Sequence, residues 1–229
     1  MRAYLRTFFG YGQLRARYWF IGLEEGGVRT LDEFLTRLDA WSRCGQPELV
    51  DLASFHHQIG VDEWFRDPVP LQRTWRALMR ARFAAEGVEN VSTEQLRRFQ
   101  ARQLGSSSGD TALLELLPLP ARGRAPDEPW IYQPLGIADL ASRERYIAAY
   151  TDLRRDALTK MVRNYQPRAV VTYGDVQRWR TRLGADTSLN AKAWTTTVGA
   201  TVIVCSPHPE GARANAHWDE IGRYIRATE

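Results

Sequence analysis

Four short apolar runs in this chain end abruptly in turn-forming residues, and helical patterns lie between them. Each run is rich in β-branched, aromatic or leucine residues and is short enough for a buried strand. They cover residues 17–22, 111–118, 168–173 and 201–205, and residues 195–198 add a further short strand. Strands that alternate with helices pair in parallel and are covered by helices on both faces. We therefore expect an α/β fold of three layers, α/β/α, around a central, mostly parallel four-stranded sheet, with residues 1–229 forming a single domain.

The helices are predicted from apolar residues at helical spacing and from their capping residues. Thr30 with Glu33, and Ser92 with Gln95, have the spacing of a capping box. The predicted helices cover residues 31–42, 71–86, 93–104 and 142–165, a short stretch that ends at Leu183, and residues 215–227. We expect a long loop with short helical pieces over residues 44–70, and the proline-rich segment 118–134 cannot form a regular helix.

Composition narrows the classes of protein that the chain can belong to. The formal net charge of +4 is compatible with binding of nucleic acid. No run of about 18 apolar residues and no secretory signal is visible, so we expect a cytoplasmic protein without a membrane partner. Cys44 and Cys205 are too few for a disulfide framework, and the four histidines lack zinc-binding spacing, which predicts no metal and no cofactor.

Three common catalytic motifs are missing from the sequence. There is no G-x-x-x-x-G-K-[ST] phosphate loop, no G-x-G-x-x-G dinucleotide turn and no G-x-S-x-G nucleophile elbow. The candidate chemistry lies instead at the ends of the predicted strands. Because right-handed crossovers gather the carboxyl ends of parallel strands, we expect Glu24, Glu115, Gly174 and His208 to lie along one edge of the sheet.

Two of these strand ends carry recognisable turns, Gly22-Leu23-Glu24-Glu25-Gly26 after the first strand and His208-Pro209-Glu210-Gly211 after the last. They resemble motifs of the uracil-DNA glycosylase superfamily. Its members have a G-x-[DNA]-P-G or GQDPY turn after the first strand and an HP-containing loop after the last. Glu115 falls where the family has a base-reading asparagine. The resemblance spans about residues 17–226 and implies a monofunctional DNA glycosylase, a divergent member that could belong to an anti-phage branch acting on modified bases.

The resemblance also implies roles for individual residues. Glu24 would position or deprotonate water, or stabilise the positive charge that develops on the sugar when the C1′–N bond breaks. His208 would donate a hydrogen bond to O2 of the departing pyrimidine, so both are expected to be catalytic. The expected contacts to the flipped base come from Gly22, Leu23, Glu25, Gly26, Glu115 and Pro209, and Arg213 is the expected DNA-binding probe.

The chain departs from the family pattern at three positions. Glu24 stands where relatives have Asp, Asn or occasionally a small residue, Glu25 replaces the usual proline, and Glu115 replaces asparagine. An ionised Glu115 would accept a hydrogen bond from the amino group of cytosine and repel O4 of uracil, which favours cytosine or a modified cytosine as the substrate. Modified bases occur in bacteriophage DNA, so phage defence stands beside DNA repair as a hypothesis.

Simpler interpretations of these residues remain open. Glu24 or Glu25 could cap the turn, and His208 could pack against its neighbouring prolines. Glu115 could pair with an arginine or be exposed at a strand end. As a whole, the chain could be an inactive nucleic-acid-binding protein of this fold, or a hydrolase of free nucleosides or nucleotides.

The remaining expectations concern the substrate and the product. The expected partner is duplex or single-stranded DNA, bound by a monomer. Phe55, Trp130 and Tyr132 are candidates to stack on the base. Neither lysine, Lys160 or Lys192, lies in a motif loop, so the predicted product is an intact abasic site.

Overall fold

The apolar runs form the middle of one sheet in the computed structural model, which describes residues 1–121, 129–212 and 214–228. The four middle strands lie in the order β4-β2-β5-β8 and are all parallel to their neighbours. Their bounds are Tyr18–Glu24 for β2, Thr111–Leu117 for β4, Ala169–Tyr173 for β5 and Thr201–Ser206 for β8. Nearly every residue in them is buried, as expected for strands covered on both faces. The α/β class is confirmed.

The predicted strand count is wrong, because the described residues form a mixed sheet of eight strands in the order β3-β1-β4-β2-β5-β8-β7-β6. The added strands are β1 (Gly10–Tyr11), β3 (Leu49–Val50), β6 (Thr187–Asn190) and β7 (Ala193–Val198). β1, β6 and β7 each run antiparallel to a neighbour. β1 and β3 are two residues long, too short to give a periodic pattern, and tertiary packing rather than local sequence places them.

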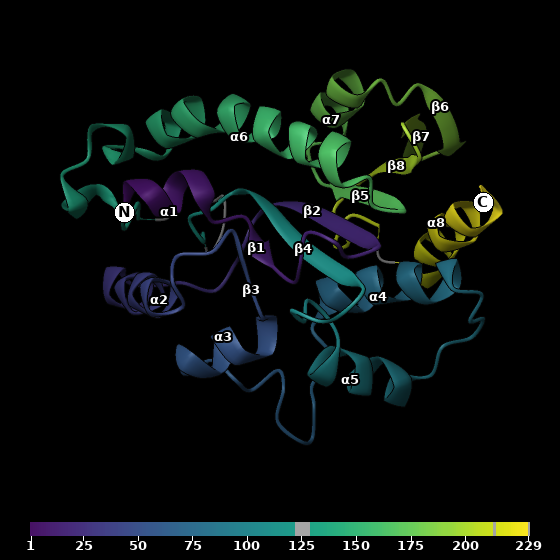
Figure 1. Ribbon diagram of the computed structural model, residues 1–229, viewed down its shortest axis with the longest axis horizontal. Helices are drawn as coiled ribbons and strands as arrows, with labels where there is room; N and C mark the ends of the chain where they lie inside the picture. The colour runs from purple at the N-terminus through teal and green to yellow at the C-terminus, as the bar shows by residue number, and fades with distance from the viewer. Residues whose placement is uncertain (122–128, 213, 229) are drawn as a thin grey trace.

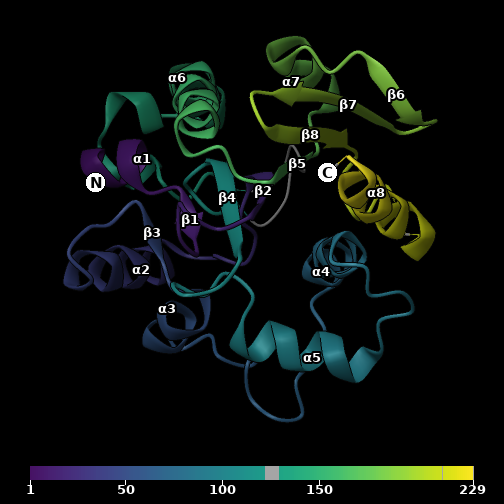
Figure 2. The same ribbon diagram turned by 45° about the vertical axis from the view of Figure 1, so that its right-hand side comes forward.

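Helices lie on both sides of this sheet (Figures 1 and 2). In Figure 2, α1, α6 and α7 lie on one side, and α2, α3, α4, α5 and α8 lie on the other. The helices are α1 (Arg2–Thr7), α2 (Leu31–Arg43), α3 (Leu52–Gln58), α4 (Arg73–Ala85), α5 (Thr93–Arg102), α6 (Arg143–Tyr165), α7 (Val176–Leu183) and α8 (Asn215–Ala227). Two 3₁₀ turns, Gln133–Leu135 and Ala138–Leu140, precede α6.

Capping explains where several helices begin. The Thr30 side chain accepts from the Glu33 amide at 3.2 Å, and Ser92 and Gln95 form a complete capping box before α5. Ser142 caps α6 through the Arg145 amide at 3.3 Å. The predicted starts of these three helices are therefore confirmed.

Two packing features hold α8 against α4 and α6 against β4. A Cβ at Gly222 would lie 2.2 Å from the Ala81 carbonyl oxygen, so glycine is needed for α8 to pack closely on α4. On the other side of the sheet, the fully buried Arg154 of α6 donates to four backbone carbonyls. These belong to Leu5, Phe8, Glu115 and Leu116, at 2.6 to 3.1 Å. Burial lowers the pKa of Arg154 to about 10, which still leaves it charged at neutral pH and anchored to the end of β4.

Candidate active site at the carboxyl edge of the sheet

The ends of β2, β4 and β5 bring a carboxyl group and a phenol together above a glycine. Gly22 of β2 lies opposite Glu115 of β4. A Cβ at Gly22 would lie 2.5 Å from Oε2 of Glu115 and 2.6 Å from the hydroxyl oxygen of Tyr173. These two side chains therefore occupy the space that any larger residue at position 22 would need. Gly22 has an ordinary backbone conformation, so this close approach is what requires glycine there.

The Glu115 carboxyl is held in its neutral form. Burial raises its pKa well above the usual value, and the nearby carboxylates of Glu25 and Glu24 raise it further, against the opposing effects of Arg154 and Tyr173. Oε2 is buried and makes no close hydrogen bond among the residues that the structure describes, although the Tyr173 hydroxyl is near enough to lower the pKa of the carboxyl as a donor. A neutral carboxyl offers one O–H donor and one C=O acceptor. The expectation that Glu115 is ionised is therefore wrong. Its burial and the nearness of the Glu24 and Glu25 carboxylates could not be predicted from the sequence.

Tyr173 connects this carboxyl to the predicted histidine. The rings of Tyr173 and His208 lie 5.7 Å apart between centroids, at an interplanar angle of 54°. Burial and the carboxyl groups of Glu115 and Glu25 raise the pKa of Tyr173 well above its usual value, so it remains a protonated phenol. The sequence analysis missed Tyr173. Its signal was its position as the last residue of an apolar run, directly before Gly174, where strand-end side chains gather.

The loop after β8 fixes the tautomer of His208. The Glu210 amide donates to Nδ1 of His208 at 3.2 Å, while the amides of Gly211 and Ala212 donate to its carbonyl oxygen at 2.8 and 3.0 Å. Since Nδ1 accepts, a neutral His208 ring carries its proton on Nε2, where it can act as a donor. The side chain is exposed, and the adjacent Pro209 is buried.

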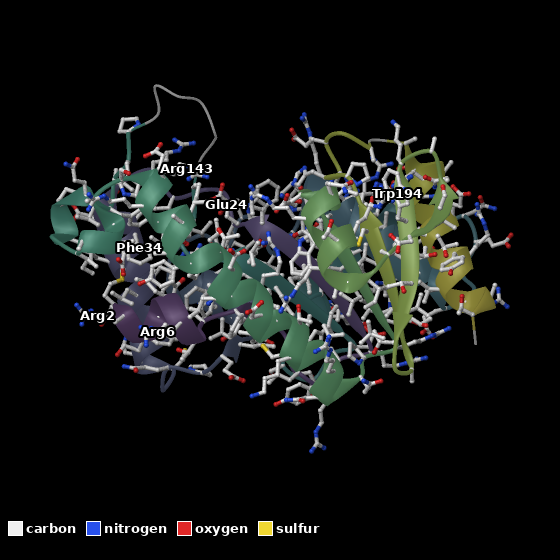
Figure 3. The ribbon with its side chains drawn as sticks, turned by 90° about the horizontal axis from the view of Figure 1, so that it is seen from above. Arg2, Arg6, Glu24, Phe34, Arg143 and Trp194 are labelled. Carbon is white, nitrogen blue, oxygen red and sulfur yellow. The ribbon has the colours of Figure 1, made fainter. Side chains whose placement is uncertain are left out.

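Glu24, at the end of β2, is held by a cation from α6. Its carboxylate forms an ion pair with Arg143, the first residue of α6, and Figure 3 shows these two side chains next to each other. The Glu24 side chain is 8% exposed. Arg143 also lies 5.9 Å from the centre of the Trp130 ring. Because it is nearly buried, this pair restricts the orientation of the Glu24 carboxylate far more than a surface pair would.

Glu25 is held by the side chains of Arg37, Tyr11 and His56. Its carboxylate receives two hydrogen bonds from Arg37, at 2.7 and 3.1 Å, and one from the Tyr11 hydroxyl at 2.6 Å. Nε2 of His56 lies 3.5 Å away. Burial alone would raise the pKa of Glu25, but Arg37, His56 and Tyr11 together lower it to about 2. Glu25 thus anchors the loop after β2, and a contact from it to substrate stays a prediction.

The other predicted contact residues lie around this edge in different environments. Leu23 lines an open pocket of about 260 Å³ together with Leu117, Arg143, Ile147, Thr151, Asp175 and Arg178. At Gly26, an added Cβ would come no nearer than 3.9 Å to a neighbouring atom, so the packing does not require glycine there. Arg213 lies outside the described residues.

The three candidate stacking residues are not equivalent. Phe55 and Tyr132 are each 1% exposed, and the Tyr132 hydroxyl donates to the Pro120 carbonyl at 2.6 Å, so both belong to the core. Trp130 is partly exposed and lies beside Arg143. Of the three, Trp130 is therefore the residue able to contact a ligand near Glu24.

The residues that the structure describes offer neither a cluster of metal-binding side chains nor a membrane-spanning helix. They contain no group of three or more His, Cys, Asp or Glu side chains arranged to hold a metal ion. Nor do they include a helix with the length and apolar character needed to cross a bilayer.

Comparison with known proteins adds no family to this geometry. No protein-family model matches the sequence, and no curated protein matches it significantly. The possible functions therefore follow from the chemistry of the residues at this edge of the sheet, which are Gly22, Glu24, Glu115, Tyr173 and His208.

Proposed function

We propose that this protein is a monofunctional DNA glycosylase with the fold of the uracil-DNA glycosylase superfamily. It would extrude a pyrimidine nucleotide, either a cytosine derivative or uracil, and hydrolyse the N-glycosidic bond to leave an abasic site. One observation carries the proposal. The side chains of Glu115, Tyr173 and His208 meet at the strand ends, and the Glu24 carboxylate at the end of β2 is held by Arg143.

The neutral Glu115 carboxyl matches the edge of a pyrimidine. Toward cytosine, its O–H donates to N3 and its carbonyl oxygen accepts from the N4 amino group. Toward uracil, the same O–H donates to O4 and the carbonyl oxygen accepts from N3–H. A carboxylic acid thus offers the donor and acceptor of an asparagine amide. Glu115 alone therefore does not exclude uracil, and the choice of base is left to the experiment.

Glu24 and His208 would act on the two sides of the bond that breaks. The Glu24 carboxylate would stabilise the positive charge on the sugar or orient the attacking water, with Arg143 fixing its direction. The Nε2–H of His208 would donate to O2 of the departing base and spread its negative charge. Both groups stabilise charge that exists only as the bond breaks, so their removal is expected to lower kcat more than it raises KM.

The test is release of the base from defined oligonucleotides. Duplexes and single strands containing uracil, mismatched thymine, cytosine, hydroxymethylcytosine or glucosylated hydroxymethylcytosine are incubated with the protein and assayed for alkali-labile sites. Free nucleosides serve as a parallel substrate set. We expect Glu24→Gln and His208→Ala each to lower the rate about 100-fold. The exposed Glu63→Gln variant is the matched control and keeps the full rate.

The outcomes separate this proposal from its rivals. Release from free nucleosides at rates equal to those from DNA would indicate a nucleoside hydrolase. An inactive binding protein would bind DNA in a salt-dependent way, release no base from it, and bind equally well after Glu24→Gln. That result would refute the proposal. Release of glucosylated or hydroxymethylated cytosine, and not of uracil, would support a role in defence against phage with modified DNA.

A further inference from the structure

A chain of polar contacts joins α8 and the β6–β7 hairpin to the peptide just before His208. Asn190 ends β6, His217 lies in the first turn of α8, and Ser206 ends β8. The Asn190 amide nitrogen lies 3.5 Å from Nδ1 of His217 and 2.7 Å from a Glu220 carboxylate oxygen. Nε2 of His217 lies 2.9 Å from the Ser206 hydroxyl, which in turn lies 3.1 Å from the Pro207 carbonyl oxygen.

The direction of each hydrogen bond follows from the backbone. The side-chain oxygen of Asn190 accepts from the amides of Lys192 and Ala193, at 2.9 and 3.0 Å, which fixes its NH₂ group toward His217 and Glu220. Nδ1 of His217 therefore faces a donor and must accept, so the ring proton lies on Nε2 and is donated to Ser206. The Ser206 hydroxyl is then left to donate to the Pro207 carbonyl.

Ser206 also lies next to the other groups of the candidate site. It is fully buried and pairs with Tyr173 in the sheet, and its carbonyl oxygen accepts from the Gly174 amide at 3.0 Å. Tyr173 contacts both Glu115 and His208, as described above. The chain of contacts therefore ends at the point from which the His208 loop leaves the sheet.

We infer that Ser206, His217 and Asn190 are positioning residues that hold the Pro207 peptide, and with it the His208 imidazole, in the orientation that base release requires. This inference rests on the proposed function. The three residues touch neither the base nor the sugar, and they act through the loop.

The network needs His217 to be neutral. A second ring proton would place an N–H at Nδ1 against the NH₂ group of Asn190, which cannot turn over without releasing the Lys192 and Ala193 amides. The ionisable groups that bear on His217 are Glu220 from α8 and Lys192 from the hairpin. Burial lowers the pKa of His217, Glu220 opposes this shift and Lys192 adds to it, so the neutral ring prevails at neutral pH.

The test compares variants of the network with a matched control that cuts another link between α8 and the hairpin. Ser206→Ala removes the last step, His217→Phe removes the ring nitrogens, and His217→Gln keeps a side-chain NH₂ donor. Tyr224→Phe is the control, because the Tyr224 hydroxyl joins α8 to Thr195 of β7 at 3.1 Å, a link that involves none of Ser206, His217 and Asn190.

We expect Ser206→Ala and His217→Phe to lower kcat about 10-fold with KM changed by less than about 2-fold, because a small displacement of a catalytic group acts on the chemical step. His217→Gln should recover most of the loss. The wild-type rate should fall at acid pH as His217 takes up a proton, and this acid limb should be absent in His217→Gln. Losses equal to that of Tyr224→Phe, or losses carried by KM, would overturn the inference.

A second measurement keeps the test independent of activity. Nitrogen NMR of the imidazoles should find Nε2 protonated and Nδ1 unprotonated in both His208 and His217, and Ser206→Ala should shift the His208 signals while Tyr224→Phe leaves them unchanged. If wild-type protein releases no base, the proposed function fails and this measurement alone decides the positioning claim. Unchanged His208 signals in Ser206→Ala would refute it.

Discussion

Replacing Glu115 with glutamine should stabilise the protein, by an amount that grows with pH. In the unfolded chain the Glu115 carboxyl ionises near pH 4.5, whereas in the folded protein burial and the carboxylates of Glu25 and Glu24 keep it protonated to much higher pH. Because the folded pKa is raised, the contribution of this group to stability is fully present below pH 4.5 and is lost as pH rises toward the folded pKa. Glutamine keeps a neutral donor and acceptor and has nothing to ionise.

The magnitude follows from the linkage relation. Each pH unit between the unfolded and folded pKa values costs the wild-type protein about 1.4 kcal/mol relative to Glu115→Gln. Between pH 5 and pH 6 the difference in melting temperature should therefore widen by about 3 to 6 °C for a domain of this size. All other titrating groups are common to both proteins, so the difference between them isolates Glu115.

The assay is thermal and urea unfolding of both proteins at pH 5, 6, 7 and 8, with the exposed Glu63→Gln variant as the control. The control should follow the wild-type curve at every pH. Parallel curves for Glu115→Gln and wild type would refute the reasoning, because they would mean that the carboxyl ionises equally readily in the folded and unfolded chains. In the base-release assay, Glu115→Gln should also remain active at alkaline pH, where the wild-type carboxyl ionises.

Three further substitutions test the packing around the site by urea unfolding. Gly22→Ala should destabilise the protein by about 1 to 3 kcal/mol, since its Cβ would lie 2.5 Å from Glu115, and unchanged stability would mean that the carboxyl moves aside freely. Arg37→Met leaves the Glu25 carboxylate buried without its main partner and should cost about 3 to 5 kcal/mol, much of it recovered by adding Glu25→Leu. Arg154→Met removes the buried donor to four backbone carbonyls and should cost at least about 3 kcal/mol, and a smaller loss would show that other donors or water replace it.

The middle of the fold could be predicted from local patterns because those patterns have local causes. The four parallel strands are buried on both faces, so each is an apolar run that ends at a turn. The starts of α2, α5 and α6 follow from the capping residues Thr30, Ser92 and Ser142. The outer strands β1, β3 and β6 have two to four residues, and their pairing depends on neighbours brought from elsewhere in the chain.

For the candidate site, the sequence predicts where a side chain lies but not whether it is charged. The position of Glu115 near the end of a strand was visible in the sequence, but its protonation state was not, because that depends on Glu24, Glu25 and Arg154 from two other places in the chain. For the same reason, Arg143 could not be identified among the many arginines of the sequence as the partner that orients Glu24. Residue type and spacing locate a side chain on an edge, whereas its charge is set by contacts that only the folded chain makes.

The opposite protonation states of Glu25 and Glu115 bear directly on what this edge can do. Arg37 keeps one carboxyl ionised down to a pH of about 2, and burial keeps the other neutral well above its usual range, although both belong to one local cluster. The fixed negative charge of Glu25 adds to the raised pKa of Glu115, because it opposes ionisation of that carboxyl. Paired groups whose pKa values are driven apart are a common arrangement in enzymes that need an acid and an anion at the same pH. Removing the charge of Glu25 should therefore lower the pKa of Glu115, so in a protein carrying Glu25→Gln the alkaline loss of base release should begin at lower pH than in wild type.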